Sequence, residues 1–139
     1  MYQIIIASHG PVANAMKESL QFFFKDLKNV HTVTLDRDGI GKFSCNISEV
    51  LESYKNDELL VFVDLFYGTP FNEFARQCTE LEANFEIISG VNMPSLIEAV
   101  NYQEQGKNLR EVIDSIMRAG KINTFSNTIE KSQVKDDDE

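Results

Sequence analysis

The stretch YQIIIASHGPVANAMKESL, residues 2–20, joins a short apolar run to a helical pattern through a single turn. Ile4, Ile5 and Ile6 begin the run, which is typical of a buried strand. Beyond the Gly-Pro pair, apolar or small residues recur every three or four positions, as one face of a helix requires. They are Val12, Ala15, Met16, Ser19, Leu20 and Phe23. The pattern therefore predicts a strand and then a helix, with His9 at the junction.

The same alternation continues along the chain. Apolar runs predict further strands at residues 29–36, 58–65 and 85–91. Helical spacing predicts further helices at residues 47–54, 70–80, 94–103 and 107–119. Strands that are apolar throughout are buried on both faces, and their alternation with helices is typical of a parallel sheet. We therefore predict an α/β fold, an open and mainly parallel sheet with helices on both faces. Residues 122–129 are ambiguous and are a candidate for a short fifth strand.

Composition limits the classes of function. The chain has 139 residues and 42% hydrophobic content, enough for one domain, which we place at residues 1–130. Its 13 basic and 22 acidic residues give a net charge of -9, and the basic residues form no run. This balance argues against binding a nucleic-acid backbone. Residues 131–139 are polar and charged, and we expect them to form a disordered acidic tail.

Several other classes lack their sequence signals. The apolar runs are far shorter than the roughly 18 residues that a membrane span needs, and no basic region precedes the first run as in a secretory signal. Cys45 and Cys78 form no CxxC pair, which favours two free thiols in a cytoplasmic protein. Neither a glycine-rich nucleotide motif nor metal-ligand spacing occurs, so we predict no cofactor and no metal.

The ends of three predicted strands carry the polar residues of interest. Ligands of open α/β sheets bind beyond the carboxyl ends of the strands, where the strand order reverses. Each of the three junctions pairs a glycine with a proline near the start of a helix, and a helix start is a potential anion site. The junctions are Ser8-His9-Gly10-Pro11, residues 64–72 beginning with Asp64, and residues 89–94. If the first and third strands are neighbours, His9 and Asp64 face one another.

That pair suggests phosphoryl chemistry. A carboxylate that accepts a hydrogen bond from one imidazole nitrogen leaves the other nitrogen free to attack. Helix starts beside it would stabilise an anionic phosphoryl group. We predict that this group is bound by Thr69, Gly10, Gly68 and Ser8. Each residue alone also has an ordinary structural explanation, such as a loop histidine or a helix cap. His31 lies inside a predicted strand without an acidic neighbour, which favours a structural role.

Three segments resemble a known family. IIIASHGPVANAMKESL, VFVDLFYGTPFNEFAR and EIISGVNMPSLIEAV are similar to the enzyme IIA component of the mannose-type phosphoenolpyruvate-dependent sugar phosphotransferase system, over roughly residues 1–103. The resemblance implies the strand order 2-1-3-4. It also implies that His9 accepts a phosphoryl group from the histidine phosphocarrier protein and passes it to a IIB component, that Asp64 orients His9, and that Thr69 supplies the hydroxyl of the motif.

The resemblance leaves some features of this chain open. Tyr67 stands where the family commonly has a second glycine, and the match weakens from Lys107 onward. In the family, a short strand at the position of residues 122–129 is exchanged between the subunits of a homodimer, so we expect a homodimer here. We also expect an apolar rim around His9 that docks partner proteins. Its candidates are Val12, Phe66, Tyr67, Phe71 and Met93.

Other functions also fit parts of the pattern. A binding module regulated by phosphorylation of His9 could use the same fold, and so could the phosphotransferase subunit of a dihydroxyacetone kinase. A hydrolase with His9 as general base and Asp64 behind it lacks a serine or cysteine nucleophile in a recognisable setting. We therefore place the phosphocarrier first. The sequence does not identify the sugar, which is chosen by the membrane components of such a system.

Overall fold

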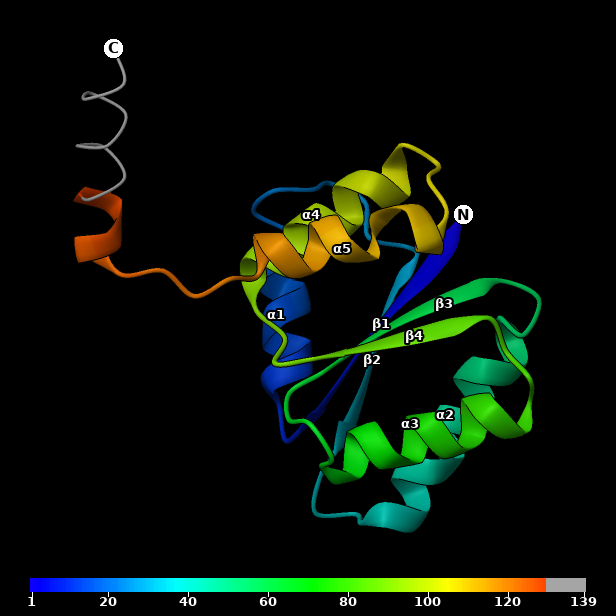
Figure 1. Cartoon of the computed structure of the whole chain (residues 1–139). Coiled ribbons are helices and arrows are strands. Elements are labelled where there is room, and N and C mark those ends of the chain that lie inside the picture. Colours follow the sequence, from blue (N-terminus) through cyan, green and yellow to red (C-terminus); the bar gives the residue numbers. More distant parts are fainter. Residues whose placement is uncertain (130–139) are drawn as a thin grey trace.

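The computed structural model describes residues 1–129, in which strands and helices alternate (Figure 1). The strands are β1 (Tyr2–His9), β2 (Val30–Leu35), β3 (Glu58–Val63) and β4 (Phe85–Ser89). The helices are α1 (Val12–Leu20), α2 (Ile40–Ser53), α3 (Thr69–Glu80), α4 (Met93–Glu104) and α5 (Leu109–Ala119). The predicted alternation is confirmed. No helix in this part of the chain is long and apolar enough to cross a membrane.

The four strands form one parallel sheet in the order β2-β1-β3-β4. Ile5 of β1 pairs with His31 on one side and with Val61 on the other, and Val61 pairs in turn with Ile87. The α/β class and the strand order 2-1-3-4 are therefore confirmed. The strand order reverses between β1 and β3, which places a crevice beyond their carboxyl ends.

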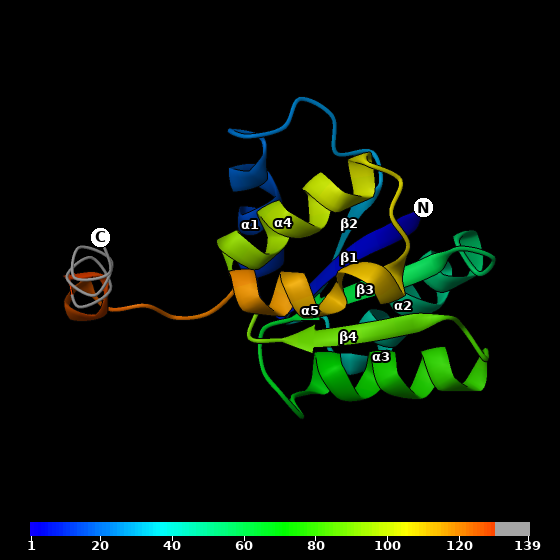
Figure 2. The same ribbon diagram turned by 45° about the horizontal axis from the view of Figure 1, so that its top comes forward.

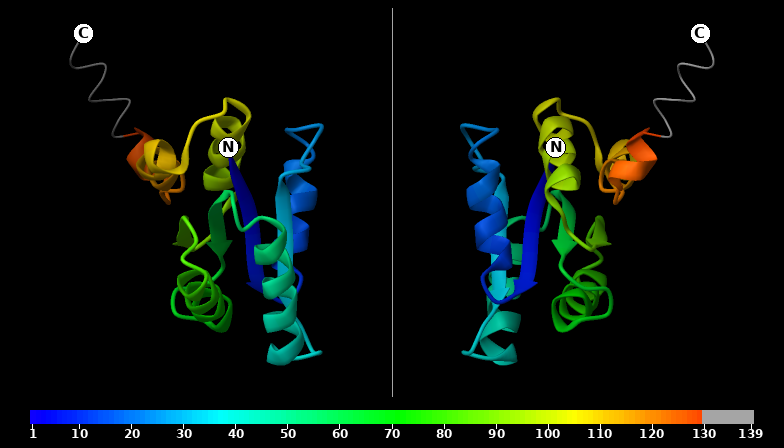
Figure 3. Two further views of the ribbon diagram at one scale, coloured as in Figure 1. Left: turned by 90° about the vertical axis from the view of Figure 1, so that its right-hand side faces the viewer. Right: turned by 90° about the vertical axis from the view of Figure 1, so that its left-hand side faces the viewer.

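Helices cover both faces of the sheet, as Figures 1, 2 and 3 show: α1, α4 and α5 lie on one face, and α2 and α3 lie on the other. Ile4 and Ile6 of β1 pack toward the first group, and Ile5 and Ala7 pack toward the second. All four side chains are fully buried. Because successive side chains of a strand point to opposite faces, a central strand between two helical layers must be apolar throughout.

Helix α2 begins earlier than the sequence pattern predicts. It starts at Ile40, directly after Gly39, whose φ of 94° lies in the left-handed region. Its first buried apolar residue is Phe43, and Ile47 and Leu51 continue the same face. Ile40 and Phe43 extend the helical spacing of Ile47 toward the N-terminus, but Gly39 and Gly41 indicated a loop, so the predicted start of this helix was seven residues too late.

The predicted fifth strand is absent from residues 1–129. Residues 121–124 have no regular structure, and residues 125–129 are helical. Thr124 caps this turn, because its hydroxyl accepts a hydrogen bond from the backbone N–H of Asn127 at 3.1 Å. The segment leaves the body of the protein after α5 (Figures 1 and 2), so it has no neighbouring strand, and an unpaired strand leaves its backbone groups without partners. The predicted acidic tail lies outside the described residues.

Candidate functional site

His9 and Asp64 meet where the strand order reverses. His9 is the last residue of β1, Asp64 directly follows β3, and the two strands pair as far as Ala7 and Val63. One carboxylate oxygen of Asp64, Oδ2, lies 2.9 Å from His9 Nδ1 and also accepts the backbone N–H of His9 at 2.9 Å. The other oxygen, Oδ1, accepts the N–H of Leu65 at 3.0 Å. The predicted proximity of His9 and Asp64 is confirmed.

These hydrogen bonds favour the ionised form of Asp64 and fix which ring nitrogen of His9 donates to it. Burial alone would raise the pKa of Asp64, but the hydrogen bonds from the backbone and ring of His9 and the charge of the ring outweigh it and hold this pKa below its usual value. An ionised carboxylate only accepts hydrogen bonds, so Nδ1 of His9 carries the hydrogen, and in the neutral form of the ring the lone pair lies on Nε2. The His9 side chain is 43% exposed and that of Asp64 only 17%. Nε2 therefore belongs to an accessible ring backed by a shielded carboxylate.

Gly68 provides the space that the imidazole occupies. A Cβ atom built on Gly68 would lie 3.1 Å from His9 Cε1, closer than ordinary van der Waals contact. The φ of Gly68 is -75°, so its backbone conformation is open to any residue, and glycine is needed there for room alone. Gly68 therefore lies next to the ring. This steric role was not predicted from the sequence, which grouped Gly68 with the phosphoryl-binding residues.

Ser8 and Gly10 form hydrogen bonds that hold the turn between β1 and α1. The Ser8 hydroxyl accepts the N–H of Ala13 at 2.8 Å and donates to the carbonyl of Gly10 at 2.9 Å, and Ser8 is fully buried. The N–H of Gly10 donates to the Leu35 carbonyl at 2.8 Å, and its φ of 64° makes the turn. These bonds argue against a phosphoryl contact for either residue. Thr69, in contrast, opens α3 and is partly exposed.

Aromatic side chains stand beside the histidine. Phe66 and Tyr67 are 58% and 71% exposed, and their ring centroids lie 4.1 Å apart. Phe71 is half-buried, and its ring centroid lies 5.0 Å from that of Phe66 and 5.4 Å from that of Tyr67. Among the other predicted docking residues, Val12 is exposed, whereas Met93 packs against the core between the sheet and helices α1, α4 and α5. The exposed part of the predicted rim is therefore aromatic and comes mainly from the loop after β3.

His31 occupies a separate polar cluster. It pairs with Ile5 of β1, four residues before His9, and its Nε2 lies 2.8 Å from Gln3 Oε1. Its ring lies against Tyr54 with centroids 4.5 Å apart. Burial, followed by the charge of Lys17, lowers its pKa. These contacts fit the structural role expected of His31. Within residues 1–129, no group of three or more His, Cys, Asp or Glu side chains could hold a metal ion.

Comparison with known proteins assigns the chain to a family. Residues 3–117 match the family model described as the PTS system fructose IIA component. The protein is a member of this IIA family. It is 30% identical over 101 residues to the sorbose-specific EIIA component of Lacticaseibacillus casei, covering 71% of this chain and 72% of that one. It is 31% identical over 106 residues to the fructose-specific EIIA component of Bacillus subtilis, and the match covers 75% of this chain and 72% of that one.

A solved structure agrees with the assignment. The phosphotransferase system component EIIA of Streptococcus agalactiae aligns with a TM-score of 0.78 and 25% identity, covering 91% of this chain and 99% of that one. The protein is therefore a sugar phosphotransferase IIA component, and the resemblance in the strand-end motifs is confirmed.

Pattern reading of this IIA component missed one residue near the site. The side chain of Asn72, in the first turns of α3, donates to the Tyr67 carbonyl at 3.1 Å. Asn72 ends the motif GTPFN, and its distance of four residues from Gly68 is the only signal in the sequence that could have indicated it.

Proposed function

We propose that this IIA component is a cytoplasmic phosphocarrier that receives a phosphoryl group on His9 Nε2 from the histidine phosphocarrier protein and passes it to a IIB component. The observation that carries the proposal is the hydrogen bond between His9 Nδ1 and Asp64 Oδ2 at 2.9 Å, on a ring that is 43% exposed. This arrangement fixes one nitrogen and leaves the other open to a partner. The names of its sorbose- and fructose-specific relatives support the sugar pathway.

The proposed transfer needs no proton to move. The Nε2 lone pair of His9 attacks phosphorus, an N–P bond forms, and the N–P bond of the donor histidine breaks, so the donor nitrogen leaves with the bonding electrons. The Nδ1 hydrogen of His9 stays on the bond to Asp64, whose negative charge stabilises the phosphorylated and now cationic ring. Transfer to the IIB component repeats the same exchange, with His9 as the leaving group.

The phosphoryl oxygens would lie near the start of α3. The backbone N–H groups at a helix start carry partial positive charge and favour an anion. Thr69 opens this helix and is partly exposed, so its hydroxyl can donate to a phosphoryl oxygen. We therefore keep Thr69 as a phosphoryl-binding residue and assign Gly68 to shaping the space around the ring.

Labelling with radioactive phosphoenolpyruvate tests the proposal. In the presence of enzyme I and the histidine phosphocarrier protein, the wild-type chain should take up label that is stable in base and lost in acid, as a phosphoramidate is. His9→Ala should take up none, and His31→Ala, the matched control, should label normally. Labelling of folded His9→Ala would overturn the assignment, as would loss of label in folded His31→Ala.

A further inference from the structure

The loop beside His9 holds an unusual backbone conformation. Tyr67 has a φ of +59°, in the left-handed region. Within residues 1–129 only one other residue that is not glycine, Glu82, has a positive φ. Side chains disfavour this region because the Cβ atom approaches the neighbouring carbonyl oxygen. Something in the structure must therefore stabilise the loop at Tyr67.

Asn72 supplies that stabilisation. Its side-chain Nδ2 donates to the Tyr67 carbonyl at 3.1 Å, and its backbone N–H donates to the Gly68 carbonyl at 3.0 Å. The residue is exposed, so its amide does not fill the core. By contrast, the hydrogen bond from the Gly68 N–H to the Leu65 carbonyl is long, at 3.4 Å, and therefore weak. The side chain of Asn72 thus anchors this loop to the rigid start of α3.

The anchored loop is one of two boundaries of the imidazole. Asp64 holds the ring at Nδ1, at a distance of 2.9 Å, and Gly68 faces Cε1, the carbon between the two ring nitrogens, so closely that an added Cβ would lie 3.1 Å from it. The hydrogen bond alone leaves the ring free to tilt about Nδ1. The closeness of Gly68 to Cε1 limits that tilt, so a displacement of Gly68 would change the direction of Nε2.

We propose that Asn72 is a positioning residue, which fixes the direction of His9 Nε2 by clamping the Tyr67-Gly68 backbone against the imidazole ring. The proposal deepens the proposed function and rests on it for its biological meaning. Reactive nitrogens must be aligned with phosphorus for in-line transfer, and small misplacements slow such steps strongly.

The test compares two variants of Asn72 with matched changes on α4. Asn72→Ala removes the hydrogen bond, whereas Asn72→Asp keeps the size but sets a carboxylate oxygen against the Tyr67 carbonyl. Asn101 is exposed on α4 and serves as control through Asn101→Ala and Asn101→Asp. Phosphoramidate is the donor, because a small molecule needs no docking surface. The ¹⁵N NMR shifts of the His9 ring report its tautomer and environment before any phosphorylation.

We expect Asn72→Ala to slow labelling about three- to ten-fold, the effect of one neutral hydrogen bond. Asn72→Asp should slow it more, although an acidic residue near a helix start should not lower the melting temperature. In both variants the ring ¹⁵N shifts should move away from their wild-type values, because the ring tilts in its hydrogen bond to Asp64 once Gly68 is displaced. The Asn101 variants should match the wild type in rate and shifts.

Two outcomes would overturn the proposal. One is labelling of both Asn72 variants at the wild-type rate. The other is slower labelling with unchanged ¹⁵N shifts, since Asn72 would then act on the phosphoryl group or on α3 rather than on the ring. Failure of the proposed function looks different: phosphoramidate would label His9, with the Asn72 effects intact, while the histidine phosphocarrier protein would transfer nothing.

Discussion

Asp64 contributes both an orientation and a charge to His9. Asp64→Asn keeps the volume, but its amide can donate to the ring and so hold the wrong tautomer, with the hydrogen on Nε2. We expect the fold to survive and phosphoryl transfer from the histidine phosphocarrier protein to slow about ten- to ten-thousand-fold, the range seen for acid-base and orienting groups. Stopped-flow or quench-flow transfer measurements check this. Wild-type rates in the variant would remove Asp64 from the mechanism.

Gly68 gives a second test of the His9 environment. Gly68→Ala adds a carbon 3.1 Å from His9 Cε1, so the ring or the loop must shift by a few tenths of an ångström. We expect transfer to slow about ten-fold or more because the direction of Nε2 changes, while thermal unfolding changes little, since alanine fits a φ of -75°. Gly41→Ala, in the first turn of α2 and with nothing within 4 Å of an added carbon, controls for a general effect of removing glycine. A Gly68→Ala rate equal to that of the wild type would show that the ring tolerates the added carbon.

Helices α2 and α3 are joined by a polar cluster with a clear pH dependence. The Glu73 carboxylate pairs with Arg76 and accepts hydrogen bonds from Ser44 at 2.7 Å and Gln77 at 3.0 Å. The hydrogen bond from Arg76 has the largest effect on the pKa of Glu73. Together with the smaller effects of Ser44 and Gln77 it outweighs burial and lowers this pKa to about 2. Because the folded pKa lies below the unfolded value, this stabilisation is complete above about pH 4.5 and is lost as the pH falls toward 2.

Glu73→Gln should therefore lower the free energy of unfolding at pH 7 by about 1 to 3 kcal/mol. The difference from the wild type should shrink between pH 4.5 and 2, the range set by the two pKa values. Urea unfolding of both proteins at several pH values measures this difference in free energy. Glu49→Gln, on an exposed position of α2, is the control and should change little. A Glu73→Gln penalty that stays constant down to pH 2 would contradict the assignment.

The loop between β3 and α3 carries exposed aromatic side chains. Tyr67→Ser removes the most exposed of the three clustered rings and leaves His9 and Asp64 in place. We expect the apparent Michaelis constant for at least one partner protein to rise several-fold, because exposed apolar groups beside a site commonly form transient interfaces. Labelling by phosphoramidate should be less affected than labelling by the protein donor. Unchanged kinetics with both partners would refute a docking role for Tyr67.

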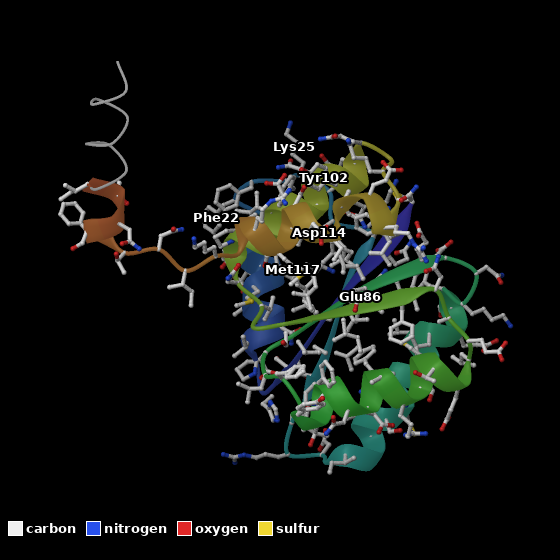
Figure 4. The ribbon with its side chains drawn as sticks, viewed as in Figure 1. Phe22, Lys25, Glu86, Tyr102, Asp114 and Met117 are labelled. Atoms are coloured by element: carbon white, nitrogen blue, oxygen red, sulfur yellow. The ribbon has the colours of Figure 1, made fainter. Side chains whose placement is uncertain are left out.

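Within residues 1–129, the sheet has two unpaired outer edges, β2 and β4, and residues 122–129 lie apart from the body of the protein. In residues 1–129, β4 pairs only with β3, so its outer edge is unpaired. Figure 4 shows Glu86 of β4 and Asp114 and Met117 of α5 on this side of the protein. Beyond α5, Ile122 and Phe125 are 89% and 80% exposed. Unpaired edges and exposed apolar residues are features that proteins usually cover.

We therefore predict a homodimer in which residues 122–129 of each subunit contact the other subunit. Exchange of a segment forms a closed symmetric pair with few new contacts. Analytical ultracentrifugation of the full chain and of a version ending at Gly120 tests both parts of this prediction. A full chain that is monomeric at micromolar concentration would contradict the dimer. A truncated chain that dimerises as tightly as the full one would contradict the role of the segment.

The sequence alone determined the alternation of strands and helices and the position of His9 at a strand end. Those features depend on neighbouring residues: the run of isoleucines must be buried on both faces, and a Gly-Pro pair ends a strand and opens a helix. By resemblance, the sequence also indicated the strand order, which places Asp64 beside His9. It misplaced residues 122–129, because a strand needs a neighbouring backbone that local sequence does not supply.

Only the tertiary structure decided how the site fits together. His9 and Asp64 are 55 residues apart and share a hydrogen bond because β1 and β3 pair in register. The space that Gly68 leaves for the ring and the clamp from Asn72 to Tyr67 are likewise distances between backbone segments. Periodicity reports which side chains are buried, but such distances are set by the packing of the whole sheet and its helices.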